Sequence, residues 1–178
     1  MYVVHVILID LSNIVNQFNL LIVILIELIN MARAANRIKR EMEKFNSEPT
    51  EGFRLEVQSD NIWLMHVTGP SGTLYAGENY TLKIRFTDDY PMDSPEVVFI
   101  PPSPVHPHIY SNGHICLNIL GDDWSPALTV QSVCISIVSM LASATEKTRP
   151  PDDDRYSRSK PAGANAKATK FMYHDDSV

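Results

Sequence analysis

The spacing of hydrophobic residues changes along the chain, and this change predicts the order of its elements. Between Ala32 and Asn46 apolar residues recur at the helical interval, which puts Ile38, Met42 and Phe45 on one face. Another face carries the basic residues Arg37, Arg40 and Lys44. A proline and a glycine soon afterwards end the segment. We therefore predict a first helix with its apolar face toward a core and its basic face toward solvent.

Four later segments alternate between apolar and polar residues, which is the interval of a β-strand. They are residues 53–57, 62–68, 80–86 and 97–100. Turn residues at 69–72 and 76–77 allow consecutive strands to pair as an antiparallel meander. Because an open sheet needs a cover on one face, the first helix can provide part of it. The pattern predicts an α+β domain.

A long irregular segment, residues 101–128, follows the last strand and contains five prolines. A loop of this length inside a compact domain usually carries function. Thr129 then fits a helix N-cap, and apolar residues at helical spacing from Val130 to Leu141 predict a second helix that packs on the sheet. Cys134 lies on the apolar face of that helix, so we predict that it is a small core residue.

Residues 1–30 differ in composition from the rest of the chain. They are rich in Val, Ile and Leu, contain no Lys or Arg, and are interrupted by Asp10, Glu27 and several amides. The unbroken apolar runs are shorter than the about 20 residues of a membrane-spanning helix, and the basic start and cleavage site of a secretory signal are missing. Since a basic helical segment begins abruptly after Met31, we interpret residues 1–30 as an upstream extension or an apolar tail. No membrane is an expected partner.

The other end of the chain is rich in Pro, Asp, Ser, Ala and Lys from residue 150 to about residue 170. Such a composition cannot bury enough apolar surface to stay ordered, so we expect mobility beyond Arg149. The predicted division is a core domain over residues 31–156 and a flexible tail over residues 157–178.

Charge and cysteine content exclude several classes of function. The chain has 178 residues, a formal net charge of −6 and only two cysteines. A negative surface repels phosphate backbones, so nucleic acid is not an expected partner. Two cysteines do not make the disulfide framework of a small secreted domain, which favours a reducing compartment. We expect the protein in the cytoplasm, the nucleus or both.

Cys116 lies in the long polar loop, close in sequence to His106, His108, Asn112 and His114. Three interpretations compete at this point. The cysteine could be buried in an apolar plug with its two neighbours, or it could join the histidines in a metal site. The histidine and cysteine spacing is not that of common zinc sites, and no carboxylate stands nearby as support. Thirdly, it could be an exposed nucleophile with a nearby donor for the oxyanion of an acyl transfer.

The loop and its flanks contain a series of spaced motifs. They are Tyr90-Pro91, His106-Pro107-His108, Ser111-Asn112-Gly113-His114-Ile115-Cys116-Leu117, Trp124-Ser125-Pro126-Ala127-Leu128-Thr129 and Pro150-Pro151-Asp152-Asp153. This series resembles the ubiquitin-conjugating enzymes, over about residues 32–148. The resemblance implies that family's α+β fold and an acyltransferase that needs no cofactor or metal. Cys116 would receive ubiquitin as a thioester from an ATP-dependent activating enzyme and pass it to a protein amine, usually with a RING or U-box type ubiquitin ligase.

The resemblance also implies roles for single residues. Cys116 would be the nucleophile, His108 would stand in the place of the oxyanion donor, and Asp153 would position or deprotonate the incoming amine. Asn112 and Asp152 would help to position the substrate. The surface shared by the activating enzyme and the ligase would comprise Arg37, Arg40, Met92, Pro126 and Ala127. A solvated acidic turn and a solvated basic helix face are the alternatives for the charged residues. Trp124 is expected to hold the loop in place.

One motif departs from the family pattern. Most members have His-Pro-Asn where this chain has His106-Pro107-His108, and the missing asparagine is the family's oxyanion donor. With Tyr173-His174-Asp175-Asp176, this makes the chain similar to the W-type members, which modify the α-amino group of proteins with flexible N-termini. Losing such a donor costs about 3 kcal/mol. The pKa of an α-amine is roughly 2.5 units below that of lysine, so a larger fraction of the α-amine is unprotonated near neutrality. This difference is equivalent to about 3.4 kcal/mol and offsets the cost of the missing donor.

Other functions remain open as rivals. Transfer to lysine is the alternative within the family, and a non-catalytic ubiquitin-binding relative would share the fold but lack the nucleophile. A thiol peptidase usually activates its cysteine at a helix N-terminus beside a histidine base. Cys116 instead precedes its predicted helix by about a dozen residues.

Overall fold

The structure is a computed structural model that describes residues 2–160, with side chains described from residue 13 onward. Its elements are α1 (Tyr2–Ser47), β1 (Phe53–Ser59), β2 (Ile62–Thr68), β3 (Asn79–Arg85), β4 (Glu96–Phe99), the 3-10 turn η1 (Asn118–Leu120), α2 (Val130–Ser143) and α3 (Asp153–Ser159). The strands pair antiparallel in the order β1-β2-β3-β4. The predicted α+β class, the meander and the second helix are confirmed.

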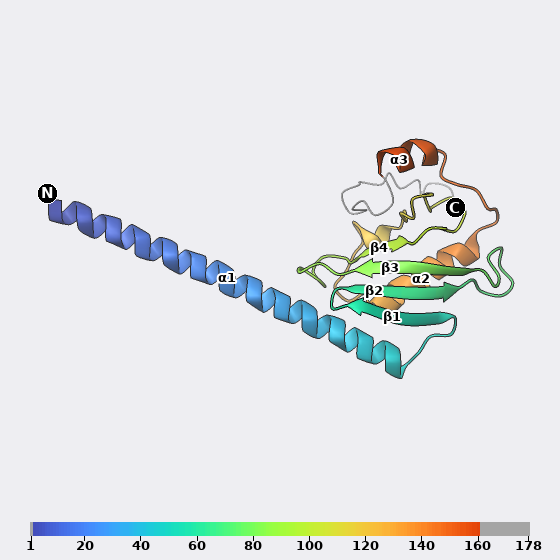
Figure 1. The fold of residues 1–178 in the computed structure, drawn as a ribbon, viewed down its shortest axis with the longest axis horizontal. Coiled ribbons are helices and arrows are strands. Elements are labelled where there is room, and N and C mark those ends of the chain that lie inside the picture. The colour runs from blue at the N-terminus through green and yellow to red at the C-terminus, as the bar shows by residue number, and fades with distance from the viewer. Residues whose placement is uncertain (1, 161–178) are drawn as a thin grey trace.

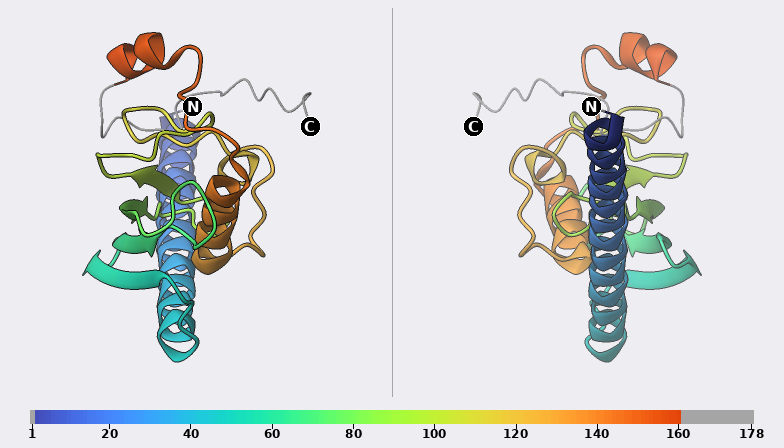
Figure 2. Two further views of the ribbon diagram at one scale, coloured as in Figure 1. Left: turned by 90° about the vertical axis from the view of Figure 1, so that its right-hand side faces the viewer. Right: turned by 90° about the vertical axis from the view of Figure 1, so that its left-hand side faces the viewer.

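The core lies between the sheet and α2, which stand side by side in Figure 2. Alternate residues of β2 and β3 point into it, including Trp63, Met65 and Ile84. Thr129 caps α2 as predicted, because its side-chain oxygen accepts a hydrogen bond from the backbone N–H of Ser132 and the serine hydroxyl reciprocates. Helix α2 is thereby fixed behind the sheet, with its N-terminus directly after the long loop.

Cys134 is a core residue, as predicted. It is buried on the apolar face of α2, and burial raises the pKa of its thiol to about 12. A thiol in this environment stays protonated and is a poor nucleophile. Of the two cysteines, only Cys116 is accessible.

Helix α1 is longer than the sequence pattern predicts. The expected helix of residues 32–46 is present, with Phe45 buried and Ile38 and Met42 packed against the core. The helix does not begin there, however, but continues without interruption through Met31 toward residue 2. Figure 1 shows this extension projecting away from the sheet. A division of the chain at Met31 stays a prediction.

The extension changes one conclusion drawn from the sequence. Among the described residues, the helix segment Asn13–Ser47 is long and apolar enough to cross a membrane, with a mean hydropathy of 1.8 in its best window. The prediction that residues 1–30 are too short to span is therefore wrong. That prediction counted only unbroken apolar runs, whereas a spanning helix tolerates isolated polar residues.

The expectation of mobility beyond Arg149 is wrong for the first part of that segment. Residues Asp153–Ser159 form α3, which lies beyond the β4 edge of the sheet in Figure 1. Its first turn holds Asp153 and Asp154, and acidic residues there stabilise a helix through its dipole. Residues 161–178, which make up most of the predicted flexible tail, lie outside the described residues.

Candidate active site

The long loop between β4 and α2 is held against the sheet by its own backbone. Val98 of β4 forms an antiparallel bridge with His114, and the backbone N–H of Phe99 donates a hydrogen bond to the carbonyl oxygen of Gly113. Gly113 has a φ of +92°, and a Cβ added to it would lie 2.0 Å from the Phe99 carbonyl oxygen. Only glycine fits at this close approach, so Gly113 fixes the course of the loop before Cys116.

Cys116 is partly exposed beside His108. Its backbone N–H donates a hydrogen bond to the His108 carbonyl oxygen, with 2.9 Å between nitrogen and oxygen. The preceding residue, Ile115, is buried in the core, so an apolar plug does exist in this loop. The plug does not include Cys116, and the interpretation of this cysteine as a buried hydrophobic residue is wrong. Accessibility is what a nucleophilic thiol requires.

His106 connects the active-site loop to α2 through its two ring nitrogens. Its Nδ1 accepts a hydrogen bond from the backbone N–H of His108 at 2.9 Å, and its Nε2 faces the carbonyl oxygen of Met140 on α2 at 3.2 Å. The side chain is only 2% exposed, and this burial, together with the neighbouring His108, lowers the pKa of His106 to about 4. The neutral ring therefore links the active-site loop to α2 at ordinary pH.

The histidines of the loop do not converge on a common point. The Nδ1 atom of His114 lies 2.8 Å from the Tyr156 hydroxyl, on the side of α3. His106 instead uses both of its ring nitrogens on the α2 side. Within residues 13–160, no group of three or more His, Cys, Asp or Glu is placed to hold a metal ion. The metal interpretation has no geometric support.

Helix α3 is fastened onto the active-site loop. The Oδ1 atom of Asp153 accepts a hydrogen bond from the backbone N–H of Ser111 at 2.7 Å. The side-chain amide of Asn112 donates to the carbonyl oxygen of Lys160 at 2.7 Å, and its Oδ1 accepts from the backbone N–H of His114. Asn112 is buried, and its amide serves the loop itself. The sequence interpretation assigned it only to the substrate, so this structural role was missed.

Tyr110 connects the active-site loop with Asp152. Its hydroxyl donates a hydrogen bond to Oδ1 of Asp152 at 3.1 Å, and its ring lies on that of Tyr156 with 4.0 Å between centroids. Burial and the Asp152 carboxylate raise the pKa of Tyr110. The tyrosine therefore holds the start of α3 against the loop. Sequence reasoning missed it, because an aromatic residue beside Ile109 looks like part of the core.

Arg149 is a second residue that the sequence analysis missed. Its guanidinium donates hydrogen bonds to the backbone carbonyl oxygens of Ser103, Pro104 and Ile109 at 2.6 to 3.1 Å. Three carbonyls of the loop thus share one rigid donor group. From the sequence, Arg149 was only the last residue before a predicted tail. The signal that could have revealed it is a lone arginine opposite a proline-rich loop, which has few N–H donors of its own.

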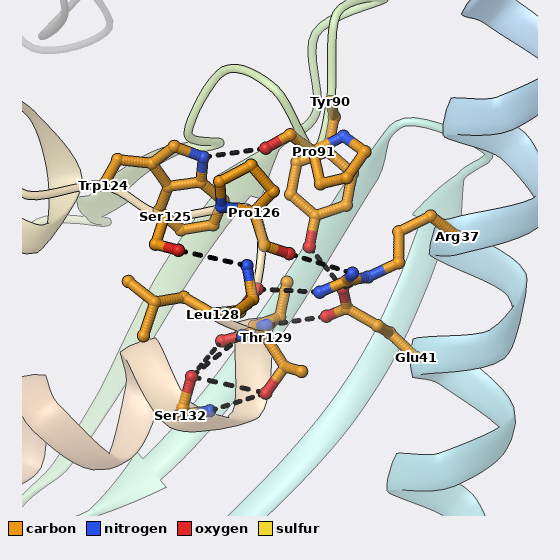
Figure 3. A network of polar contacts seen from close by, with 12 residues as sticks. Arg37, Glu41, Tyr90, Pro91, Trp124, Ser125, Pro126, Leu128, Thr129 and Ser132 are labelled. Atoms are coloured by element: carbon orange, nitrogen blue, oxygen red, sulfur yellow. Dashed lines mark hydrogen bonds and ion pairs between the residues drawn. The ribbon is translucent and has the colours of Figure 1, made fainter.

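Arg37 does not lie on a fully solvated helix face, because its side chain is only partly exposed, and its place in the partner surface stays a prediction. Figure 3 shows Arg37 and Glu41 of α1 pointing at the loop before α2. The Arg37 guanidinium pairs with Glu41 at 2.5 Å and donates to the carbonyl oxygens of Pro126 and Leu128 at 3.0 and 2.8 Å. Helix α1 therefore holds the loop before α2 by hydrogen bonds to its backbone carbonyl oxygens.

Glu41, one turn after Arg37 on α1, is only 8% exposed. Its carboxylate accepts hydrogen bonds from the Tyr90 hydroxyl and from the backbone N–H of Val130 at the start of α2. A negative charge at a helix N-terminus is favourable, and here it also satisfies a buried N–H group. The carboxylate joins α1, α2 and the loop that carries Tyr90.

The remaining residues of the predicted partner surface are exposed. Met92 is 75% exposed, and Arg40, Pro126 and Ala127 also reach solvent. The indole N–H of Trp124 donates to the Pro91 carbonyl oxygen at 2.8 Å, which fastens the two loops together as predicted. A groove of about 400 Å³ adjoins them, lined by Asn30, Arg33, Arg37, Asp88, Asp89, Tyr90, Pro91 and Met92.

Comparison with known proteins identifies one family. The family model described as "Ubiquitin-conjugating enzyme" matches residues 37–172. The chain is 52% identical over 147 residues to "Probable ubiquitin-conjugating enzyme E2 16" of Arabidopsis thaliana, covering 82% of this chain and 91% of that protein. It is 48% identical over 149 residues to "Probable ubiquitin-conjugating enzyme E2 W" of Dictyostelium discoideum, covering 83% of this chain and 99% of that protein.

Solved structures agree with the sequence relatives. The ubiquitin-conjugating enzyme UbcA1 of Agrocybe aegerita superimposes with a TM-score of 0.72 and 45% identity, covering 75% of this chain and 98% of that one. Human ubiquitin-conjugating enzyme E2 G1 superimposes with a TM-score of 0.59 and 33% identity, covering 63% and 97% of the two chains.

Proposed function

The chain belongs to the ubiquitin-conjugating enzyme family, and from this premise we propose that Cys116 carries ubiquitin and passes it to the α-amino group of a protein N-terminus. As a member of the family it is a thioester-forming transferase that works with ubiquitin, an activating enzyme and ubiquitin ligases. The observation that carries the proposal is the backbone hydrogen bond between the accessible Cys116 and position 108, where this chain has a histidine rather than an asparagine.

The proposed reaction consists of two acyl transfers. The Cys116 thiolate attacks the carbonyl carbon of the C-terminal glycine of ubiquitin on the activating enzyme, so that one S–C bond forms as another breaks. An unprotonated amine then attacks the same carbon, an N–C bond forms, and the Cys116 thiolate leaves. The amine releases its extra proton to a base or to water. The buried thiol of Cys134 cannot compete for the cargo, because its raised pKa keeps it protonated.

The nature of residue 108 favours an α-amine as the acceptor. Without the asparagine donor the oxyanion of the second transfer is stabilised less, at a cost of about 3 kcal/mol. A lysine amine is mostly protonated near neutrality, whereas an α-amine, with a pKa of about 8, is partly free. Lower basicity also makes the α-amine a weaker nucleophile, so its advantage is smaller than the pKa difference alone suggests. A weakened site should still lose lysine transfer first.

Two carboxylates are proposed to assist the incoming amine. Asp153 uses its Oδ1 to hold Ser111, which ties it to the loop backbone. Asp152 accepts a hydrogen bond from the Tyr110 hydroxyl of the same loop. Both carboxylates are thus attached to the loop that carries Cys116, and we assign the positioning of the amine to this pair.

The partner surface is proposed to consist of Arg40, Met92, Pro126 and Ala127. Exposed apolar residues on two fastened loops are typical of a docking patch. A RING or U-box type ligase and the activating enzyme would share it, so charging and transfer would alternate. Two cysteines that form no disulfide with each other suit the reducing cytoplasm or nucleus as the place of this reaction.

A discharge experiment tests the choice of amine. The enzyme is first loaded with ubiquitin, activating enzyme and ATP, and the activating enzyme is then stopped. Two peptides that differ only at one internal position and at the N-terminus are added separately, one with a free N-terminus and arginine at that position, the other acetylated at its N-terminus with lysine there. We expect loss of the thioester at least tenfold faster with the first peptide, and mass spectrometry should place ubiquitin on its α-amine. Equal rates would overturn the α-amine proposal but not the transferase.

A further inference from the structure

The part of α1 over residues 13–30 presents an apolar surface that the enzyme domain leaves uncovered. Its large hydrophobic side chains, from Ile14 to Ile29, are 42–64% exposed. In Figure 1 this part of the helix stands clear of the sheet and of α2. The helix meets the domain only from Asn30 onward, where it lines the groove beside Met92, and its first buried residue is Ala34. Leaving such a surface in water is unfavourable, so it requires a covering environment.

The arrangement of the apolar residues indicates what this environment is. Between Leu20 and Ile29 the only polar residue is Glu27, so apolar side chains surround the helix on every side. A second helix or a protein groove would cover one stripe. If it contacted Leu21 and Leu25, it would leave Leu20 and Val23 in water, because these lie on the opposite side of the helix. A lipid bilayer covers all sides at once.

The length and ends of the segment fit a bilayer as well. A membrane-spanning helix needs about 20 mostly apolar residues at 1.5 Å each. The best window of this helix has a mean hydropathy of 1.8, and none of it is buried in the protein. Asn13 and Asn30 stand at the two ends of the segment, and its other amides, Asn16, Gln17 and Asn19, lie within two turns of Asn13, toward one interface. Glu27 is within one turn of Asn30, so its carboxylate can reach the other interface. We propose that residues 13–30 of α1 span a lipid bilayer and anchor the enzyme domain to it.

Charge gives the anchor a direction. Residues 1–30 contain no Lys or Arg, whereas Arg33, Lys39 and Arg40 follow the apolar segment and are exposed. Basic residues flanking a spanning helix stay on the cytoplasmic side, so Cys116 would face the cytoplasm. The family model begins only at residue 37, which leaves the apolar segment outside the match. The anchor is therefore an addition to the family's enzyme domain and does not depend on which amine is modified.

Flotation of the full chain tests the anchor. The protein is synthesised in a cell-free system with phosphatidylcholine vesicles, washed with alkaline carbonate and floated on a density gradient. Leu21→Lys with Leu25→Lys puts two charges into the middle of the segment, where the helix touches nothing else of the domain. The matched control, Asn36→Lys with Asn46→Lys, adds the same charge on exposed positions of α1 beyond the segment.

The expected result is that the unchanged protein and the control float with the vesicles, while the floating fraction of Leu21→Lys/Leu25→Lys falls at least tenfold. Thioester formation should be equal in the unchanged protein and in both double variants. Equal loading would show that the enzyme domain of Leu21→Lys/Leu25→Lys is folded. Three results would overturn the proposal: an unchanged protein that stays soluble, one that sediments as a dimer or larger oligomer without lipid, and one that carbonate strips from the vesicles.

Discussion

The backbone N–H of Cys116 donates a hydrogen bond to the carbonyl oxygen of His108, with 2.9 Å between the two atoms. This bond joins two backbone positions that are eight residues apart, so the backbone of residue 108 is held beside that of the nucleophile. His106 accepts a hydrogen bond from the His108 N–H and bonds to α2. Backbone bonds thus fix position 108, so its side chain can be changed without removing them.

Replacing His108 by asparagine should restore transfer to lysine. The substitution returns the oxyanion donor of the wider family, and such a donor stabilises the transition state by about 3 kcal/mol, on the order of a hundredfold in rate. Discharge of loaded Cys116 to free lysine measures the effect. His108→Ala is the control, because it removes the imidazole without adding a donor. A lysine rate that is equal in the two variants would contradict the assignment of residue 108.

Replacing Glu41 by alanine should destabilise the enzyme strongly. The change leaves the Tyr90 hydroxyl and the Val130 N–H without their acceptor and removes the partner of Arg37. Breaking a buried charged network costs about 3 kcal/mol, which lowers Tm by roughly 10 °C for a chain of this size. Thermal unfolding followed by circular dichroism measures this. Glu43→Ala, on the exposed face of the same helix, should change Tm by about 2 °C or less.

Stability should fall in mild acid because of His106. Its pKa in the folded protein is about 4, below the ordinary value of 6.5. Between these two pH values the unfolded chain binds a proton that the folded protein does not. The contribution of neutral His106 to the free energy of unfolding is therefore fully present above pH 6.5. It is lost as the pH falls toward 4, and the loss is on the order of 3 kcal/mol. Denaturant unfolding at several pH values measures the slope, and in His106→Gln it should be shallower; parallel curves would refute the assignment.

Removing the Tyr156 side chain should loosen the active-site loop. Tyr156 stacks on Tyr110 and bonds to His114, so Tyr156→Ala breaks two contacts between α3 and the loop. We expect hydrogen exchange of the amides in residues 109–116 to accelerate at least tenfold, as measured by mass spectrometry. Arg158→Ala, on an exposed position of the same helix, should leave exchange unchanged. Equal protection in both variants would show that α3 does not hold the loop.

Local patterns predicted the fold well where one apolar face meets one core. The strands, the Thr129 cap and the buried Cys134 all follow from periodicities that tertiary packing does not contradict. The predicted length of α1 was too short, because residues 1–30 have no amphipathic stripe and a helix is recognised from sequence mainly by such a stripe. A helix that is apolar all round carries no such signal.

The sequence identified residues of the candidate site but not most of the contacts that they make. Cys116 and His108 do lie together, since a short loop brings them close in any case. Arg37 was assigned to a partner surface or to a solvated helix face, because charge on a surface helix is usually exposed. The groups that bond to Arg37 and Glu41, on the Pro126 loop and at the start of α2, are 89 residues away in sequence. Contacts over such distances leave no periodicity to detect, and the same holds for Arg149.

The most direct test of the account is loading of the full chain with ubiquitin. After incubation with activating enzyme, ATP and ubiquitin, the account predicts one adduct that reductant removes and that peptide mapping places on Cys116. Cys116→Ala should abolish it, and Cys134→Ala, which changes the only other cysteine of the sequence, should retain it. An adduct that survives in Cys116→Ala, or no adduct on the unchanged protein, would contradict the account.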